Sequence, residues 1–257
     1  MIDGLVSVIT PMYNAENWIK ETIRSVQAQS YNKWEMIIVD DCSTDRSVEI
    51  VKKLQTEDRR IKYYCNKINS GVAITRNNAI KYAKGRYLAF LDSDDVWHFD
   101  KLQKQIEKMK KEQKAFCYSA CEVIDEYGNR INVRYVPESV NYQELLKGNI
   151  IPCLTVVLDR WIIKNVSMPK MPHEDYATWL KIFQSGIQAC GINEPLASYR
   201  VVSSSVSNNK FKAMRWTWYI YRQFLGLDFI KSCYCFCFYV WNAIKKRRYL
   251  IATEGDE

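Results

Sequence analysis

Three carboxylates follow the apolar run Tyr87–Leu91 within four positions, namely Asp92, Asp94 and Asp95. The run is typical of a buried strand, so the acids stand at its carboxyl end, where open α/β sheets bind their ligands. Carboxylates this close repel one another unless a cation or bound protons relieve the repulsion. Hard oxygen ligands of this kind suit Mg²⁺ or Mn²⁺ shared with phosphate groups. The stretch therefore predicts a metal that carries a diphosphate, although an ordinary acidic turn has the same composition.

The first hundred residues alternate between strand-like and helix-like patterns. Pro11 is expected to break the first strand, Asn14 to cap the first helix, and Gly85 to end the third helix. Such alternation predicts an α/β fold with a parallel, doubly wound sheet. The strands are expected at 5–10, 34–39, 61–65 and 87–91, and the helices at 15–28, directly after 43–45, and at 72–83.

Polar side chains follow several of these strands and should converge at one edge of the sheet. Tyr13 and Asn14 follow the first strand, Asp40 and Asp41 end the second, and the three acids follow the fourth. A nucleotide would lie at such an edge. The sequence has neither a Gly-x-Gly-x-x-Gly fingerprint nor a Gly-Lys-Ser/Thr phosphate loop. The phosphate charge must then be met by metal and arginine, which again indicates the aspartates.

The pattern beyond residue 100 is less regular. Glu174 and Asp175 open a helix, where acidic residues are favoured by the helix dipole whatever their function. The last segment, 211–250, is helical in pattern, with a break expected at Gly226. The other elements expected here are a helix at 101–114, strands at 115–125 and 130–136, a short helix at 142–146, and strands at 153–158 and 196–201.

Four motifs in register resemble glycosyltransferase family 2, on the GT-A fold. They are Val-Ser-Val-Ile-Thr-Pro-Met-Tyr-Asn (6–14), Ile-Ile-Val-Asp-Asp-Cys-Ser-Thr-Asp (37–45), Ser-Gly-Val-Ala-Ile-Thr-Arg-Asn (70–77) and Phe-Leu-Asp-Ser-Asp-Asp (90–95). The resemblance implies a GT-A type, mostly parallel sheet flanked by helices, with a C-terminal helical appendage. It divides the chain into a catalytic domain (1–207), with a nucleotide-binding half (1–100) and an acceptor half (101–207), and a helical segment (208–257).

The resemblance also implies roles for single residues. Asp94, with help from Asp92, would hold Mn²⁺ or Mg²⁺. Asp175 would be the catalytic base, and Asp95, Glu174 and His173 would support the metal or face the acceptor. Without the family pattern, Tyr13 could be a packing aromatic, Asp41 a helix cap and Arg76 an exposed helix charge. The nucleotide-binding positions implied are Pro11, Tyr13, Asn14, Asp41, Arg76 and Asp92.

One position departs from the family pattern. Many relatives carry a histidine two places after the pair that corresponds to Tyr199-Arg200, where this chain has Val202. A histidine metal ligand is therefore in doubt, and the serines at 203–205 and 207 or water would have to complete the metal shell.

The implied activity is an inverting transfer of a sugar from a nucleotide-sugar, a UDP-sugar by preference, to a hydroxyl of a glycan or lipid-linked acceptor. Two alternatives remain open. A phosphohydrolase of the haloacid dehalogenase type also has an apolar strand ending in Asp-x-Asp-x-Val, which Asp92–Val96 satisfies. A nucleotide-sugar-binding protein without turnover would keep the same motifs.

Charge and composition suggest where the protein works. The formal net charge is +8, and residues 201–257 hold nine Lys/Arg against four Asp/Glu, so +5 of it lies there. Aromatics interleaved with aliphatics in that tail favour peripheral contact with a membrane over nucleic acid. No secretion signal and no apolar stretch of spanning length is visible, and the nine cysteines are odd in number and scattered. We expect a cytoplasmic protein with reduced thiols, and we hypothesise contact with the inner face of the cell membrane.

Overall fold

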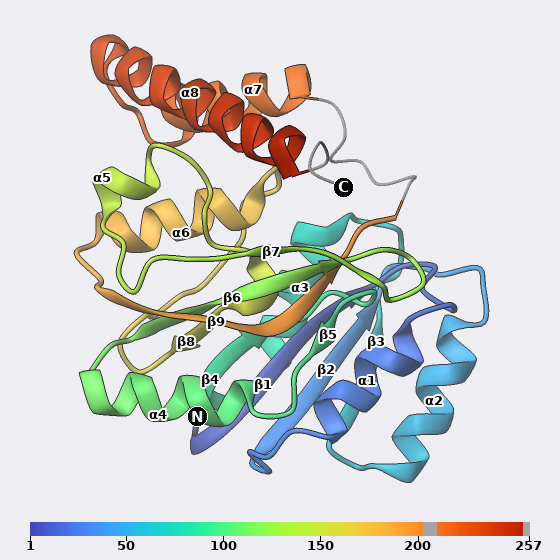
Figure 1. The fold of residues 1–257 in the computed structure, drawn as a ribbon. Helices are drawn as coiled ribbons and strands as arrows, with labels where there is room; N and C mark the ends of the chain where they lie inside the picture. Colours follow the sequence, from blue (N-terminus) through green and yellow to red (C-terminus); the bar gives the residue numbers. More distant parts are fainter. Residues whose placement is uncertain (203–209, 254–257) are drawn as a thin grey trace.

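The computed structural model describes residues 1–202 and 210–253, with the side chains of 212–242 in the second stretch. Within these residues nine strands form one sheet in the order β3-β2-β1-β4-β8-β6-β9-β5, with β7 paired to β6 (Figure 1). Neighbouring strands in the first half are parallel, which confirms the doubly wound arrangement expected there. These strands are β1 (Ile2–Met12), β2 (Trp34–Asp40), β3 (Ile61–Cys65) and β4 (Gly85–Phe90).

The second half extends the same sheet with mixed pairing. The short strand β8 is antiparallel to both β4 and β6, whereas β6 and β9 are parallel. The edges β5 and β7 pair antiparallel with β9 and β6. The bounds are β5 (Val96–Trp97), β6 (Phe116–Ile124), β7 (Arg130–Arg134), β8 (Val157–Asp159) and β9 (Ala189–Arg200).

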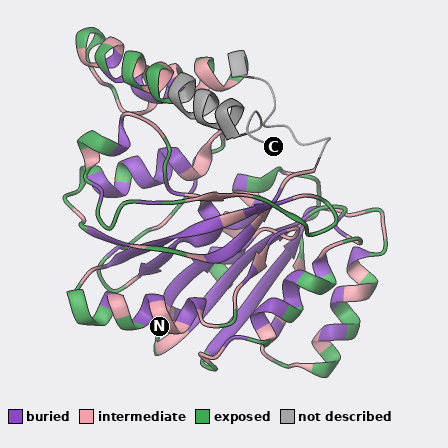
Figure 2. Cartoon of the chain, viewed as in Figure 1, coloured by how far each residue is buried: buried purple, intermediate pink, exposed green. Residues whose placement is uncertain are grey.

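Helices cover both faces of the sheet because alternate strand residues point to opposite sides. Val8, Ile38 and Ala89 belong to one buried cluster, together with the inner sides of α1 (Ile19–Gln27), α2 (Ser47–Glu57) and α4 (Lys101–Glu112). Ile9, Val39 and Phe90 belong to the other, with α3 (Val72–Tyr82), α5 (Tyr142–Leu145) and α6 (Glu174–Gln184). Figure 2 shows the strands buried between these layers. The predicted α/β fold, with a mostly parallel sheet flanked by helices, is confirmed.

The first strand is longer than expected and is not broken at Pro11. Its partner β4 pairs only as far as Ile9, whose carbonyl accepts from Leu91 N. Alternation puts the Pro11 nitrogen on the same side, beyond the last residue of β4. The missing N–H therefore costs no ladder hydrogen bond, and the strand continues beside β2 to Met12.

The first helix begins later than expected, at Ile19, and Asn14 does not cap it. Asn14 has a left-handed φ of 48°. Its Oδ1 accepts from Thr44 N at 2.9 Å, so the side chain joins two loops.

Two further local predictions were wrong. Gly85 does not end α3, whose C-cap is Ala83, but opens β4. A Cβ at Gly85 would lie 2.5 Å from the Leu5 carbonyl oxygen, so close strand packing requires glycine. The segment expected as a strand at 153–158 begins as a 3₁₀ turn, Cys153–Thr155, and only its end joins β8.

The C-terminal segment is helical, as expected. It comprises α7 (Lys210–Tyr219), a π-helical turn (Ile220–Phe224) and α8 (Phe229–Thr253), which lie over α5 and α6 (Figure 1). Gly226 has a φ of +64° and separates the two helices, which confirms the predicted break. The predicted boundary at 207–208 lies outside the described residues and stays a prediction.

Candidate active site

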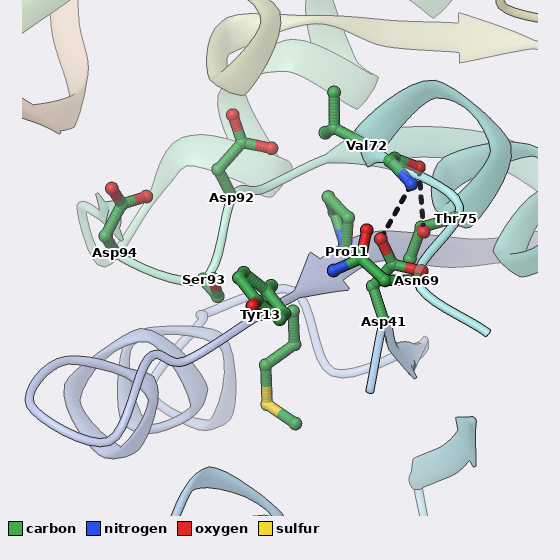
Figure 3. Close-up of a pocket in the computed structure, with 11 residues that line it drawn as sticks. Pro11, Tyr13, Asp41, Asn69, Val72, Thr75, Asp92, Ser93 and Asp94 are labelled. Carbon is green, nitrogen blue, oxygen red and sulfur yellow. Dashed lines mark hydrogen bonds between the residues drawn. The ribbon is translucent and has the colours of Figure 1, made fainter. Parts of the chain in front are cut away.

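A pocket of about 380 Å³ opens at the carboxyl ends of β1, β2 and β4. Figure 3 shows Asp92 and Asp94 on one side of it, Asp41 and Thr75 on the other, and Pro11 and Tyr13 between them. The parallel register causes this convergence, because chain ends of neighbouring parallel strands meet at one edge. The lining residues are Pro11, Met12, Tyr13, Asp41, Asn69, Gly71, Val72, Thr75, Asp92, Ser93 and Asp94.

Asp41 organises the loop that leads into α3. Its Oδ1 accepts from Ser70 N at 2.8 Å and from Asn66 Nδ2 at 2.7 Å, and its Oδ2 accepts from Gly71 N at 2.8 Å. Burial of Asp41 raises the pKa of its carboxyl, but these hydrogen bonds outweigh burial and lower the pKa below its ordinary value. The carboxylate thus stays charged and fixes one wall of the pocket.

Arg76 joins the pocket to the start of α6. Its guanidinium pairs with Asp92 Oδ1 at 2.6 Å and with Glu174 Oε1. The Arg76 side chain is only 5% exposed, so it is not the exposed helix charge considered above. The buried Arg76 side chain therefore links Asp92, 16 positions later in the chain, to Glu174, 98 positions later.

Asp94 and Asp95 differ in exposure although they are adjacent. Asp94 lines the pocket, and burial together with the charge of Asp92 raises its pKa to about 6. Asp95 is buried, and burial and the two neighbouring acids raise its pKa well above the ordinary value. Its Oδ1 accepts from Arg200 N at 2.9 Å, whereas its buried Oδ2 has no hydrogen-bond partner within the described part of the chain.

Arg200 anchors the loop that carries Asp94 and Asp95, which we call the acidic loop. Besides the backbone bond to Asp95, its Nε donates to the Asp94 carbonyl at 2.8 Å and its Nη2 pairs with Glu21 at 2.7 Å. Its Nη1 reaches the Asp125 and Glu126 carbonyls, each at 3.3 Å. This one side chain, 2% exposed, ties the acids to α1 and to the β6–β7 turn.

The donor set of the pocket fits a divalent cation shared with phosphates. Among the residues that the structure describes, no group of three or more His, Cys, Asp or Glu side chains converges as a metal site. Two carboxylates, Asp92 and Asp94, nevertheless face the pocket, and Mg²⁺ commonly takes only one or two carboxylates and completes its shell with phosphate and water. Val202 is described, but the serines at 203–205 and 207 lie outside the described residues.

Asp175 lies in the first turn of α6, next to Glu174. Burial raises the pKa of Asp175, although the Arg76 charge and the Tyr176 N–H act in the opposite direction. Asn149 Nδ2 donates to Asp175 Oδ2 at 3.4 Å, a long hydrogen bond. A carboxyl with a raised pKa is better suited to accept a proton than an ordinary surface aspartate.

His173 precedes these acids with a left-handed φ of 56°. Its ring lies edge-on to Trp216 of α7, with centroids 5.3 Å apart, and no described residue forms a hydrogen bond with its buried Nε2. Burial lowers the pKa of His173, which favours the neutral ring.

The structure brings together part of the predicted site. Pro11, Tyr13, Asp41, Asp92 and Asp94 line one pocket, and Arg76 contacts Asp92 from outside the lining. The remaining predicted residues, Asn14, Asp95, Glu174, Asp175 and His173, do not line it.

Sequence reasoning missed several residues that shape the site. Asn69 and Thr75 line the pocket and flank or belong to the third motif, so that motif could have indicated them. Arg200 and Asn149 carry no such signal, because their contacts depend on pairing across 105 and 26 positions of the chain.

Comparisons with known proteins agree with this geometry. A family model described as "Glycosyl transferase family 2" matches residues 7–159. The chain is 46% identical to TuaG of Bacillus subtilis (strain 168), whose name assigns it to teichuronic acid biosynthesis, over 95% of this chain and 97% of TuaG. It is 42% identical to WfgD of Escherichia coli, named as a UDP-Glc:alpha-D-GlcNAc-diphosphoundecaprenol beta-1,3-glucosyltransferase, over 95% of this chain and 94% of WfgD.

Solved structures share the fold at lower identity. The crystal structure of S. aureus TarS 1-349 in complex with UDP-GlcNAc has a TM-score of 0.71 and 21% identity, covering 91% of this chain and 71% of that one. Mannosyltransferase PcManGT from Pyrobaculum calidifontis, in complex with GDP-Man and Mn²⁺, has a TM-score of 0.64 and 19% identity, covering 87% and 64%.

Proposed function

Because the chain belongs to glycosyl transferase family 2, we propose that it transfers a sugar from a UDP-sugar to a hydroxyl of a lipid-linked glycan, with inversion at the anomeric carbon. The observation that carries the proposal is that Arg76 forms two ion pairs. Through them it joins Asp92, which lines the pocket, to Glu174 in the first turn of α6. Because the chain belongs to this family, we set aside the phosphohydrolase alternative that the Asp-x-Asp-x-Val pattern left open.

The donor nucleotide occupies the pocket in this proposal. Pro11 and Tyr13 flank the base, and Asp41 holds the loop of Ser70 and Gly71 against it through backbone hydrogen bonds. These groups are held before any ligand arrives, so little ordering is needed on binding.

Asp94 and Asp92 would hold Mn²⁺ or Mg²⁺ beside the diphosphate. When bound, the cation supplies Lewis-acid stabilisation of the negative charge on the departing UDP. Arg76 contributes a fixed positive charge that holds the Asp92 side chain in place.

Asp175 acts as the base. It accepts the proton of the acceptor hydroxyl as that oxygen attacks the anomeric carbon, and the bond to UDP breaks on the opposite face. A positioned carboxylate of this kind contributes roughly 10²–10⁴-fold to the rate. Glu174, held by Arg76, fixes the helix start that presents Asp175.

The proposed acceptor class is supported by the relative WfgD, whose name includes a sugar on a diphosphoundecaprenol. The C-terminal segment of this chain suits such an acceptor. Ile230, Tyr234, Phe238 and Trp241 lie on one side of α8 and are 82%, 55%, 36% and 65% exposed. We call these four residues the α8 stripe.

The α8 stripe is proposed to contact an anionic lipid surface. Its residues recur at helical spacing, and aromatic side chains near positive charge favour the membrane interface. Lys147 Nζ lies 5.0 Å from the centre of the Phe238 ring, and residues 201–257 carry a net +5 from nine Lys/Arg and four Asp/Glu. None of the helices in the described part of the chain has both the length and the apolarity needed to cross a bilayer.

The donor proposal is tested by calorimetry with UDP, GDP and CDP, each with Mn²⁺ and again with EDTA, on wild type and Asp94→Ala. We expect UDP to bind only with the metal and Asp94→Ala to lose that binding. Transfer from a panel of UDP-sugars to a sugar-diphospholipid acceptor then identifies the donor. Failure of every nucleotide to bind would refute the proposed pocket.

The membrane proposal needs a separate test. Sedimentation with vesicles of phosphatidylglycerol should pull down the wild type, and replacing Tyr234 and Trp241 by serine should release it. Phosphatidylcholine vesicles are the control, and equal binding to both lipids would contradict the charge argument.

A further inference from the structure

The loop 145–149 connects the C-terminal helices to the proposed base, because consecutive residues of this loop contact α6, the π-helical turn or α8. The Leu145 carbonyl accepts from the Tyr176 hydroxyl at 2.8 Å, and the Leu146 carbonyl accepts from the Tyr221 hydroxyl. The Lys147 carbonyl accepts from Asn242 Nδ2 at 3.2 Å. We call these contacts the loop clamp.

The remaining two residues of the loop complete this connection. A Cβ built on Gly148 would lie 4.0 Å from the Tyr239 ring of α8, so this part of the loop passes close to α8. Asn149 then ends the loop and donates to Asp175 Oδ2 at 3.4 Å. Its own Oδ1 accepts from Ile151 N at 3.2 Å, which fixes which end of the amide faces the carboxylate.

The clamp is buried where it meets the π-helical turn. Tyr221 is fully buried and its hydroxyl lies 3.4 Å from that of Tyr176, the residue after Asp175. A buried hydroxyl of this kind is costly to leave without a partner, so the loop and the helices hold each other in one arrangement.

From these contacts we propose that Asn149 is a positioning residue for Asp175, and that the π-helical turn and α8 hold Asn149 in place through the loop clamp. The proposal rests on the proposed function, in which Asp175 is the base. It gives the C-terminal segment a catalytic consequence in addition to lipid contact, because displacing α8 would displace the side chain that orients the base.

Other charged groups also face Asp175, and they set the background for any pH effect. They are Arg76 from α3, Asp92 after β4 and Glu174 on α6, and the titratable but neutral thiol of Cys153 from the 3₁₀ turn lies near them. Asn149 donates to the ionised form of Asp175 and so lowers its pKa. Loss of this donor should move the acid limb of the pH–rate profile to higher pH.

The first experiment compares Asn149→Ala and Asn149→Asp with the wild type in transfer assays. The aspartate variant keeps the oxygen that accepts from Ile151 N but replaces the donor by a second carboxylate. We expect kcat to fall about tenfold or more in both variants, with the donor KM changed less than about twofold and the acid limb shifted upward, further for Asn149→Asp.

A double variant distinguishes positioning from general damage. In the Asp175→Asn background, Asn149→Ala should cause no further loss of the residual rate, because the group that it positions is already gone. An unchanged kcat and pH profile in Asn149→Ala, or a full additional loss in the double variant, would overturn the role of Asn149.

The second experiment tests the clamp without relying on activity. Hydrogen exchange of the backbone amides in 145–149 is measured for Tyr221→Phe and Asn242→Ala, with Tyr219→Phe, which removes an exposed hydroxyl two residues away, as the matched control. We expect the amides of 145–149 to exchange faster in the first two variants than in the wild type. Their exchange rates should be unchanged in the control. Unchanged exchange in both clamp variants would overturn the clamp.

The two experiments separate the inference from the function on which it rests. A wild-type protein that transfers no sugar would overturn the proposed function and with it the role of Asn149. The exchange measurement would still decide whether the C-terminal helices hold the loop.

Discussion

The donor pocket and the surroundings of Asp175 are built in different ways. The pocket lies at the ends of three adjacent parallel strands, and its organising carboxylate, Asp41, is held partly by backbone N–H groups at 2.8 Å. Asp175 instead depends on side chains from distant segments, since Asn149 reaches it at 3.4 Å and Arg76 reaches only its neighbour Glu174. The pocket is thus fixed by the sheet, whereas Asp175, the proposed base, is positioned by tertiary contacts that a mutation or a partner can shift.

The largest expected effect is that of Asp175→Asn. Removing the base should lower kcat roughly 10²–10⁴-fold while UDP affinity, measured by calorimetry, stays unchanged. Glu49→Gln, an exposed acid on α2, is the control. Loss of UDP binding in Asp175→Asn would contradict the distinction between the two regions, because it would mean that Asp175 also contributes to the pocket.

Arg76→Ala tests the joint between the two regions. Removing the guanidinium leaves Asp92 and Glu174 without their buried partner, and breaking such a pair costs about 3–5 kcal/mol in the free energy of unfolding. Urea denaturation measures the loss. Arg24→Ala breaks the exposed pair with Glu57, whose side chains are 50% and 41% exposed, and should cost less than about 1 kcal/mol. Equal losses of unfolding free energy in the two variants would mean that the Arg76 ion pairs stabilise the fold no more than an exposed pair does.

Asp41→Asn sharpens the donor side of the comparison. The amide cannot accept all the hydrogen bonds that the carboxylate accepts, so UDP affinity should fall about 10–100-fold with kcat little changed. The lowered pKa of Asp41 gives the sign of the pH effect. Its contribution is present above the ordinary value of 3.8 and is lost only as the pH falls through the lower folded value, so UDP affinity should not depend on this group between pH 8 and pH 5. A UDP affinity that fell between pH 8 and pH 5 because Asp41 became protonated would contradict this assignment.

The smallest effect on activity is expected at Lys101, which is remote from both regions. Its fully buried ammonium donates to Gln105 at 2.6 Å and lies 4.3 Å from the centre of the Trp97 ring. Burial lowers the pKa of Lys101 from 10.5 to about 7. Lys101→Met should therefore raise the free energy of unfolding by about 1–3 kcal/mol and leave transfer unchanged.

The pH dependence of that gain follows from proton linkage. Between pH 7 and 10.5 the unfolded chain binds a proton at Lys101 that the folded chain does not, so wild-type stability rises with pH in this range. The advantage of Lys101→Met should be full below pH 7 and should shrink toward pH 10.5 in thermal or urea denaturation. A gain that is constant with pH would mean that Lys101 stays charged in the fold.

The sequence alone predicted the residues of the pocket better than the surroundings of Asp175. Tyr13, Asp41 and Asp94 each follow a strand that is buried on both faces, and such strands read as continuous apolar runs with polar ends. The doubly wound sheet was predicted for the same reason, and the GT-A fold was expected from the resemblance of the four motifs to glycosyltransferase family 2. The mixed pairing of the second half could not be predicted, because strands such as Val96–Trp97 and Val157–Asp159 are too short to carry a period.

The base region depends on contacts that no local pattern reveals. Asp175 could be suggested from the family pattern, but its neighbour Asn149 lies in a loop whose position depends on Tyr221 and Asn242, more than 70 residues later. The predicted start of α1 was wrong for a related reason. The Asn14 side chain accepts a hydrogen bond from a loop 30 residues away instead of capping the helix that follows it.

The position of Arg200 in the chain has a consequence for synthesis. Its bonds to Asp94 and Asp95 span 106 and 105 residues, and β5, directly after the acids, pairs only with β9. All four donor motifs leave the ribosome long before residue 200 does, so the nascent chain carries every recognisable motif while the acidic loop still lacks its anchor. The site is therefore completed late in translation, and a fragment that ends at residue 100 should hold the motifs without the finished pocket.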